Sequence, residues 1–245
     1  MNIPLEFAAE VAFGRPLVYK GLKIYPAECK DYYLFLTVKE SLLLNRMQEK
    51  NIRLINLPYL EYVYERAKKS KEGINDWVSL MAMLRISFKT DKISVGREKH
   101  QFYLMVTQDE KEIRISATDF ETIKDLICEL DDILVEVLDP EWEKQLQDAQ
   151  AKLAAAKPTS AGLDFEDVLC SLGVILGKLP YEMENMPIRT FNRYKKFAFG
   201  RDEYLLNHAA ELQGTKFKSK IEHWSEHYEK QSKYDNVLTN KSPQF

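Results

Sequence analysis

The stretch LDFEDVLCSLGVILGKLPYEMENMPIRTFNRYKKFAFGRDEYLLNHAAELQG, residues 163–214, decides most of what the sequence predicts about the fold. Its first part has apolar residues at the spacing of one helix face: Phe165, Val168, Leu169, Leu172, Ile175 and Leu176. Asp164 stands where an N-cap carboxylate can accept an orphan backbone N–H, and Leu163 and Val168 are spaced as a hydrophobic staple. Gly177 follows, where a left-handed residue can end the helix.

The rest of this stretch contains two more helical faces. One consists of Ile188, Phe191, Tyr194 and Ala198, and the other of Leu205, Ala209 and Leu212 before Gly214. Pro180 and Pro187 each suit a first helical turn, where the missing N–H costs nothing. We therefore predict an all-α C-terminal module over residues 164–228, with no polar cluster directed inward.

Upstream of this module, residues 1–138 combine helical and β patterns. Helical spacing predicts helices over 31–47, 59–69, 76–86 and 118–130, with Gly73 breaking the chain before the third. A capping box, Thr118 to Glu121, begins the fourth, and the helical spacing places four of its residues inward: Phe120, Ile123, Ile127 and Leu130. Alternating apolar residues predict a hairpin or two edge strands around Lys20-Gly21 and a hairpin over 101–116. Because strands and helices are segregated along the chain, we predict an α+β fold, mostly helical, with a small antiparallel hairpin or sheet in the N-terminal domain.

A polar region separates the two parts. Asp139 and Pro140 begin a helix through Ala156 that is rich in glutamine and alanine, so it has helix propensity but little to bury. Residues 157–162 have the composition of a flexible connector. We predict four parts: an α+β N-terminal domain (1–138), a polar helix and flexible linker (139–163), the helical module (164–228) and a disordered tail (229–245).

The composition bounds the class of protein. A length of 245 residues fits one large or two small domains. The net charge of −3 leaves no basic excess for broad phosphate binding, so we expect no nucleic-acid partner. The basic run Arg189–Lys196 lies among aromatic residues at helical spacing, which more often marks one buried and one solvated face than a nucleic-acid site.

No apolar stretch approaches the ~20 residues of a membrane span, and the N-terminus lacks a basic start followed by an apolar run. We therefore expect no membrane association and a cytoplasmic protein. Cys29, Cys128 and Cys170 lie far apart among apolar residues, and we predict buried, inert thiols in a reducing compartment.

Two patterns could carry chemistry. His223–His227 fits H-x-x-E-H, in which two imidazoles bind Zn²⁺ and the glutamate acts as a base. Because it precedes a polar tail, we favour a terminal helix whose Trp224 docks on the module; stoichiometric zinc would support the alternative, a metal-dependent hydrolase. The acidic pairs Asp131–Asp132 and Glu182 with Glu184 fall in charged loops, so we predict solvated surface instead of catalytic acids. We therefore expect no catalytic residues, no cofactor and no metal.

Four segments resemble the C-terminal half of tail assembly chaperones from long-tailed phages and prophages of Gram-positive bacteria. They are an acidic helix start, an M-x-I-R-x-F run, a helix ending in a small turn and a lysine-rich I-x-H-W run: Asp164–Glu166, Met186–Phe191, Leu205–Gly214 and Ile221–Trp224. The match covers about a third of the chain, and a looser match spans 24–62 and 113–130. Pro187 departs from the family, which has an ordinary helix residue there, and leaves the helix start open.

The resemblance implies a non-enzymatic chaperone of phage tail morphogenesis. Such a protein binds the tape measure protein, keeps this long client soluble and helps to recruit tail tube protein. It then leaves the particle, so it works in the host cytoplasm and is not retained in the virion. In this family a boundary like that at 157–162 often separates a short product from a longer one made by frameshifting. Self-association is open.

We predict that the client contacts exposed apolar residues of the module, because aromatic groups dominate interface energetics: Met186, Ile188, Phe191, Tyr194 and Phe197. The same spacing also fits core residues. The alternative function is a structural virion component, such as a tail or head-completion protein, which would remain in purified particles and form rings or tubes.

Overall fold

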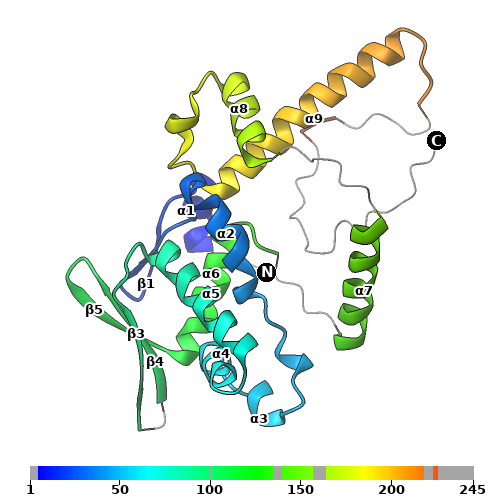
Figure 1. Cartoon of the computed structure of the whole chain (residues 1–245). Coiled ribbons are helices and arrows are strands. Elements are labelled where there is room, and N and C mark those ends of the chain that lie inside the picture. The colour runs from blue at the N-terminus through cyan, green and yellow to red at the C-terminus, as the bar shows by residue number, and fades with distance from the viewer. Residues whose placement is uncertain (1–4, 100, 135–138, 157–163, 218–222, 226–245) are drawn as a thin grey trace.

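The computed structural model describes residues 5–99, 101–134, 139–156, 164–217 and 223–225. Helices dominate, and two small antiparallel sheets lie in the N-terminal part, one of two strands and one of three. The predicted α+β class, with an all-helical C-terminal part, is therefore confirmed. In Figure 1 the sheets and most helices form one body, from which the last long helix extends.

The chain begins with a short helix and a hairpin. A 3₁₀ turn, η1 (Leu5–Phe7), leads into α1 (Ala8–Phe13), and β1 (Leu17–Tyr19) pairs antiparallel with β2 (Leu22–Ile24). The two turn residues Lys20 and Gly21 both have positive φ, as a two-residue type I′ hairpin turn requires. The predicted hairpin around these residues is confirmed.

The helix predicted over 31–47 is broken into pieces. The 3₁₀ turn η2 (Cys29–Asp31) precedes α2 (Tyr32–Val38), and the 3₁₀ turns η3 (Lys39–Leu42) and η4 (Arg46–Gln48) follow it. The Tyr59 hydroxyl accepts from the Leu44 N–H (3.0 Å) and donates to the Ser41 carbonyl (2.5 Å). These tertiary bonds satisfy backbone groups that a continuous helix would have paired internally.

Two packed helices follow the short α3 (Ile52–Ile55): α4 (Tyr59–Ala67) and α5 (Lys71–Phe88). The prediction that Gly73 breaks the chain is wrong. It lies in the first turn of α5, where its N–H donates to the N-cap Ser70 hydroxyl (2.9 Å). A Cβ on Gly73 would lie 2.4 Å from the Arg66 carbonyl oxygen. The glycine is therefore required for the close approach of α4 and α5.

The second sheet has the strand order β3 (Ile93–Glu98), β4 (Gln101–Gln108), β5 (Lys111–Ser116). The β4–β5 pair is the predicted hairpin, with Leu104 opposite Ile115, and its turn residues Asp109 and Glu110 have positive φ. Helix α6 (Ala117–Leu130) follows directly. Its N-cap is Ser116 and not Thr118, because the Ser116 hydroxyl accepts the Asp119 N–H (3.1 Å).

The main core lies between α6, α4, α5 and β4. The four residues predicted to face inward on α6 are fully buried: Phe120, Ile123, Ile127 and Leu130. In β4 every second side chain is buried, as expected for a strand with one covered face. None of the helices in the described ranges combines the length and the apolar character needed to cross a bilayer.

Helix α7 (Pro140–Ala156) begins as predicted, with the Asp139 carboxylate accepting the Glu141 N–H (2.9 Å). Its buried Glu143 accepts hydrogen bonds from the Asn45 and Gln48 amides of the N-terminal part, and Leu146 is buried as well. The predicted linker over 157–163, the predicted tail over 229–245 and the staple residue Leu163 lie outside the described residues. The predicted division into four parts stays a prediction.

The C-terminal part contains α8 (Phe165–Leu176), the 3₁₀ turn η5 (Pro180–Met183) and α9 (Ile188–Leu212). Asp164 caps α8 by accepting the Asp167 N–H (2.8 Å), and Gly177 ends it with φ +64°, both as predicted. The second and third predicted faces belong to one helix, since α9 continues through Gly200 for 25 residues. Pro187 is the N-cap of α9, one residue before the first turn where it was predicted.

Two helical glycines should respond to alanine in opposite directions. We expect Gly73→Ala to lower the free energy of unfolding by about 1–3 kcal/mol, because its Cβ would clash with backbone of α4. At Gly200 the nearest atom would lie 3.9 Å away, so Gly200→Ala should raise it by about 0.5–1 kcal/mol through helix propensity. Urea denaturation measures both changes, and equal effects would contradict the assigned packing.

Candidate functional site

The C-terminal helices attach to the N-terminal part along residues 27–30. The Ile188 N–H donates to the Ala27 carbonyl (2.8 Å), the Cys29 N–H to the Met186 carbonyl (2.9 Å) and the Lys30 N–H to the Glu184 carbonyl (3.0 Å). These bonds form a short antiparallel bridge between chain segments that are far apart in sequence. The start of α9 is therefore held by backbone pairing as well as by side chains.

Asp131 lies behind this bridge. It was predicted as solvated surface, and that prediction is wrong, because its side chain is 2 % exposed. Its Oδ1 accepts the Ala27 N–H (2.7 Å), and the buried Arg189 of α9 donates to the Glu129 carbonyl beside it. Burial raises the pKa of Asp131 to about 7, although the Ala27 N–H and the Arg189 charge both act to lower it.

A second, smaller hydrophobic cluster packs α8 and α9 onto this junction. Its buried members are Cys29, Val168, Leu172 and Phe191. The Tyr32 ring of α2 stacks on Phe165 at the start of α8, with centroids 3.9 Å apart and planes inclined by 11°. Aromatic stacking and the apolar cluster therefore fix the first half of α9 against both α8 and α2.

The structure distributes the five predicted contact residues between core and surface. Ile188 belongs to the main core and Phe191 to the smaller cluster, each 1 % exposed, so neither offers a surface to a partner in this conformation. Met186 and Phe197 are partly buried, and the Phe197 ring lies edge-on to Trp224 at 6.3 Å. Only Tyr194 of the five is classed as exposed, at 45 %. That these residues bind a client stays a prediction.

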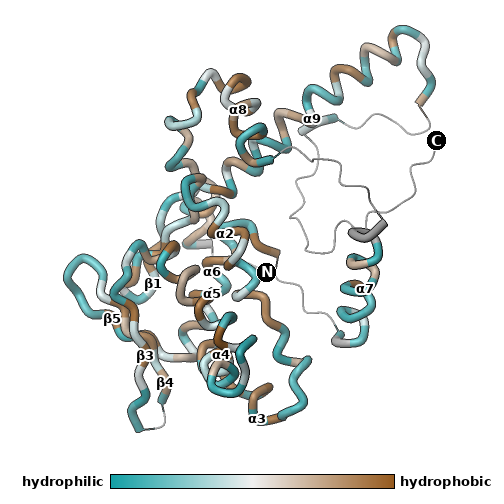
Figure 2. Tube along the Cα trace, in the orientation of Figure 1, coloured by the Kyte–Doolittle hydropathy of each residue, from teal (hydrophilic) through white to brown (hydrophobic). Residues whose placement is uncertain are grey.

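Beyond Gly200, α9 carries apolar residues that the described part of the chain leaves uncovered. Phe191, Ala198, Leu205 and Leu212 are seven residues apart, about two helical turns, and so form one row along the helix. Exposure rises along this row from 1 % at Phe191 to 51 % at Leu205 and 85 % at Leu212. The apolar face that α8 covers thus continues past α8 into solvent. Figure 2 shows apolar positions recurring along this projecting part of α9.

We call Tyr194, Leu205, Ala209 and Leu212 the α9 stripe; all four are exposed, and Leu206 beside them is 72 % exposed. The periodicity predicted Leu205, Ala209 and Leu212 as a face of a compact helical set. No sequence signal distinguishes a face covered within the chain from one left open, because both require the same spacing. The stripe is the candidate binding surface.

Helix α8 adds a second exposed apolar area at its C-terminal end. Val174 and Ile175 on α8, and Leu179 and Tyr181 just after it, are all exposed. Monomeric soluble proteins rarely leave contiguous apolar area uncovered, and such area commonly marks an interaction site. The C-terminal part therefore presents apolar surface on both of its helices.

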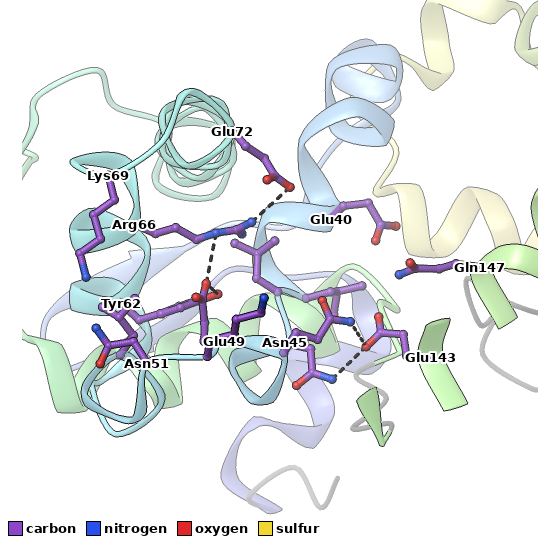
Figure 3. A pocket seen from close by; sticks show the side chains of 15 residues that line it. Glu40, Asn45, Glu49, Asn51, Tyr62, Arg66, Lys69, Glu72, Glu143 and Gln147 are labelled. Carbon is purple, nitrogen blue, oxygen red and sulfur yellow. Dashed lines mark hydrogen bonds and ion pairs between the residues drawn. The ribbon is translucent and has the colours of Figure 1, made fainter. Parts of the chain in front are cut away.

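A cleft of about 590 Å³ lies between the η3–η4 loop, α4 and α7 (Figure 3). Three of its charged groups form ion pairs: Arg66 lies 3.4 Å from Glu49 and 3.2 Å from Glu72. Glu143 accepts from the Asn45 amide (2.9 Å) and from that of Gln48 (2.8 Å). These pairs explain how α7 docks with a buried carboxylate, and we assign the cleft no ligand.

The remaining predicted chemistry is distributed as follows. Cys29 and Cys128 are buried, and burial with the nearby Glu28 charge raises the pKa of Cys29 to about 12. Cys170 is exposed, so the prediction of three buried thiols is wrong for it. Across the described ranges, no three His, Cys, Asp or Glu side chains are grouped so as to hold a metal ion. Glu226 and His227 lie outside these ranges.

Comparison of the chain with protein-family models, with curated proteins and with solved structures found no match.

Asp131 should give the stability a distinctive pH dependence. An unfolded aspartate titrates near pH 4, whereas the folded group titrates near 7, so between these values the folded protein holds a proton that the unfolded chain has lost. This group's contribution to stability therefore falls as pH rises through that window. Asp131→Asn keeps an acceptor for Ala27 without the charge.

We expect the free energy of unfolding of Asp131→Asn to increase relative to that of the parent as the pH rises from 5 to 7, by up to about 1.4 kcal/mol per pH unit. Chemical denaturation at several pH values measures the difference. Asp202→Asn removes an exposed aspartate of α9. A plot of its free energy of unfolding against pH should run parallel to that of the parent. Parallel curves for Asp131→Asn as well would show that the buried carboxylate is not protonated in the folded protein.

Proposed function

We propose that the protein is a phage tail assembly chaperone, which binds the tape measure protein, keeps it soluble and helps to recruit tail tube protein during tail morphogenesis. The proposal rests on the resemblance of residues 164–224 to that family. The observation that supports it best is the uncovered apolar surface on α9. A chaperone of this kind needs apolar surface that its client covers, together with charged flanks that keep the complex soluble.

The arrangement of α9 suits this role physically. Its first half is fixed by the junction with residues 27–30 and by the small cluster, so the second half is presented at a defined angle. Presenting apolar side chains on a fixed helix lowers the ordering cost of binding. In Figure 1 this half extends away from the sheets, where a long client could reach it without displacing any element of the body.

The remaining parts of the proposal follow from the family. The chain acts in the host cytoplasm, performs no catalysis, needs no cofactor and leaves before the virion is complete. Its partners are the tape measure protein and the tail tube protein. Neither role requires the chain to self-associate.

Co-expression with the proposed client, a tape measure protein, tests the function. We expect that protein to be soluble and to co-purify only when the chain is present. The double variant Leu205→Asp/Leu206→Asp should reduce the recovered complex about tenfold or more, since charges on the apolar surface oppose burial. Val78→Asp, at an exposed apolar position on α5, is the matched control and should bind as the parent does.

Circular dichroism of each variant separates binding from folding. Phe191→Ala should destabilise the chain by about 3–5 kcal/mol because its ring is buried, whereas Tyr194→Ala should leave the fold intact. A tape measure protein that stays insoluble with the parent chain would refute the chaperone function. Rings or tubes of this chain alone, and its retention in purified particles, would instead identify a structural virion component.

A further inference from the structure

The charged residues of α9 are separated along the helix. From Ile188 to Arg201 it carries five basic residues and no acidic one: Arg189, Arg193, Lys195, Lys196 and Arg201. From Asp202 to Leu212 it carries only acidic ones: Asp202, Glu203 and Glu211. Apart from the buried Arg189, these side chains are exposed or partly exposed, so the two halves differ in the sign of their surface charge.

This order is the reverse of the one that stabilises a helix. The helix dipole favours acidic residues near the N-terminus and basic residues near the C-terminus. In α9 the first turn contains a basic residue and no acidic one, and the last turn contains an acidic residue and no basic one. Local helix stability therefore does not account for the arrangement, whereas recognition of a partner with the opposite charges does.

The surface available to such a partner is long and narrow. The α9 stripe extends from Tyr194 to Leu212, about 27 Å at 1.5 Å per residue. One flank is partly occupied within the chain, because Tyr204 contacts His208 (5.0 Å) and His223 (5.1 Å) and Trp224 lies by Phe197. A row of Tyr, Leu and Ala of this length matches one face of an amphipathic helix of about five turns.

We propose that the α9 stripe binds one amphipathic α-helix of the client, laid along α9, whose flanking charges change sign along its length. Its acidic half lies beside Arg193–Arg201 and its basic half beside Asp202–Glu211. The inference rests on the proposed function, and it specifies the chemistry of the client segment. Apolar burial supplies affinity, and the two charge blocks set register and direction.

Two synthetic 20-residue helical peptides with the same leucine and alanine stripe test this proposal. The bipolar peptide has glutamates in one half and lysines in the other, and the mixed peptide has the same composition with both charges in each half. We expect the parent chain to bind the bipolar peptide about tenfold more tightly at low salt, because several surface pairs of up to ~1 kcal/mol act together. Fluorescence anisotropy measures both affinities.

The variant Asp202→Lys/Glu211→Lys makes the exposed flanks of α9 almost uniformly basic. It should lose the preference for the bipolar peptide, and it should bind a third peptide, with glutamates in both halves, more tightly than the parent does. Raising the salt to 0.5 M should reduce the parent's preference, because exposed charges are screened. Val78→Asp should keep the parent's preference and serves as the control for folding.

Three results would overturn the inference. Equal binding of the bipolar and mixed peptides, or binding of neither, would exclude charge-directed helix recognition. A dimer of the chain that Leu205→Asp dissociates would show that a second copy occupies the stripe. If the tape measure protein still co-purifies with Asp202→Lys/Glu211→Lys at the parent's yield, the chaperone function stands and the stripe assignment fails. Failure of co-purification with the parent chain refutes the function itself.

Discussion

The carboxylate of Asp131 lies where solvent is excluded, and the junction between the two parts of the chain is built around it. The Ala27 N–H binds the carboxylate and the Ala27 carbonyl binds the Ile188 N–H, so one peptide segment joins α6 to α9. Arg189, also buried, adds a donor to the end of α6. The Arg189 charge acts on the buried Asp131 carboxyl, so a change at either residue alters the electrostatics of the junction. The orientation of α9 depends on this arrangement.

Local signals predicted much of the fold. Caps and turns depend on near neighbours in sequence, so Asp164, Gly177 and the β4–β5 hairpin were identified correctly, as were the inward residues of α6. The larger failures involve tertiary contacts that the local pattern does not contain. The local pattern at Gly73 predicts a breaker, because the close contact of this residue with α4 leaves no trace in it. The pattern at Asp131 predicts surface, because the N–H that binds this carboxylate lies 104 residues away.

The candidate site shows the same division. Periodicity identified the apolar positions of α9, including Phe191 and Leu205, but it assigned no partner to either. Phe191 is covered by the small cluster, whereas Leu205 is exposed. Packing against α8 and Cys29 therefore decides which part of one continuous apolar face belongs to the core. Sequence spacing alone carries no information on that boundary.

The three cysteines have a further use, since each reports a different opening event. Cys170 is accessible on α8 at all times, Cys29 is sealed where the C-terminal helices meet the body, and Cys128 lies in the main core. An alkylating reagent should therefore modify them in that order, with Cys29 reacting when α8 and α9 separate and Cys128 only on global unfolding. The order in which the three cysteines are alkylated therefore reports the order in which the parts of the chain unfold.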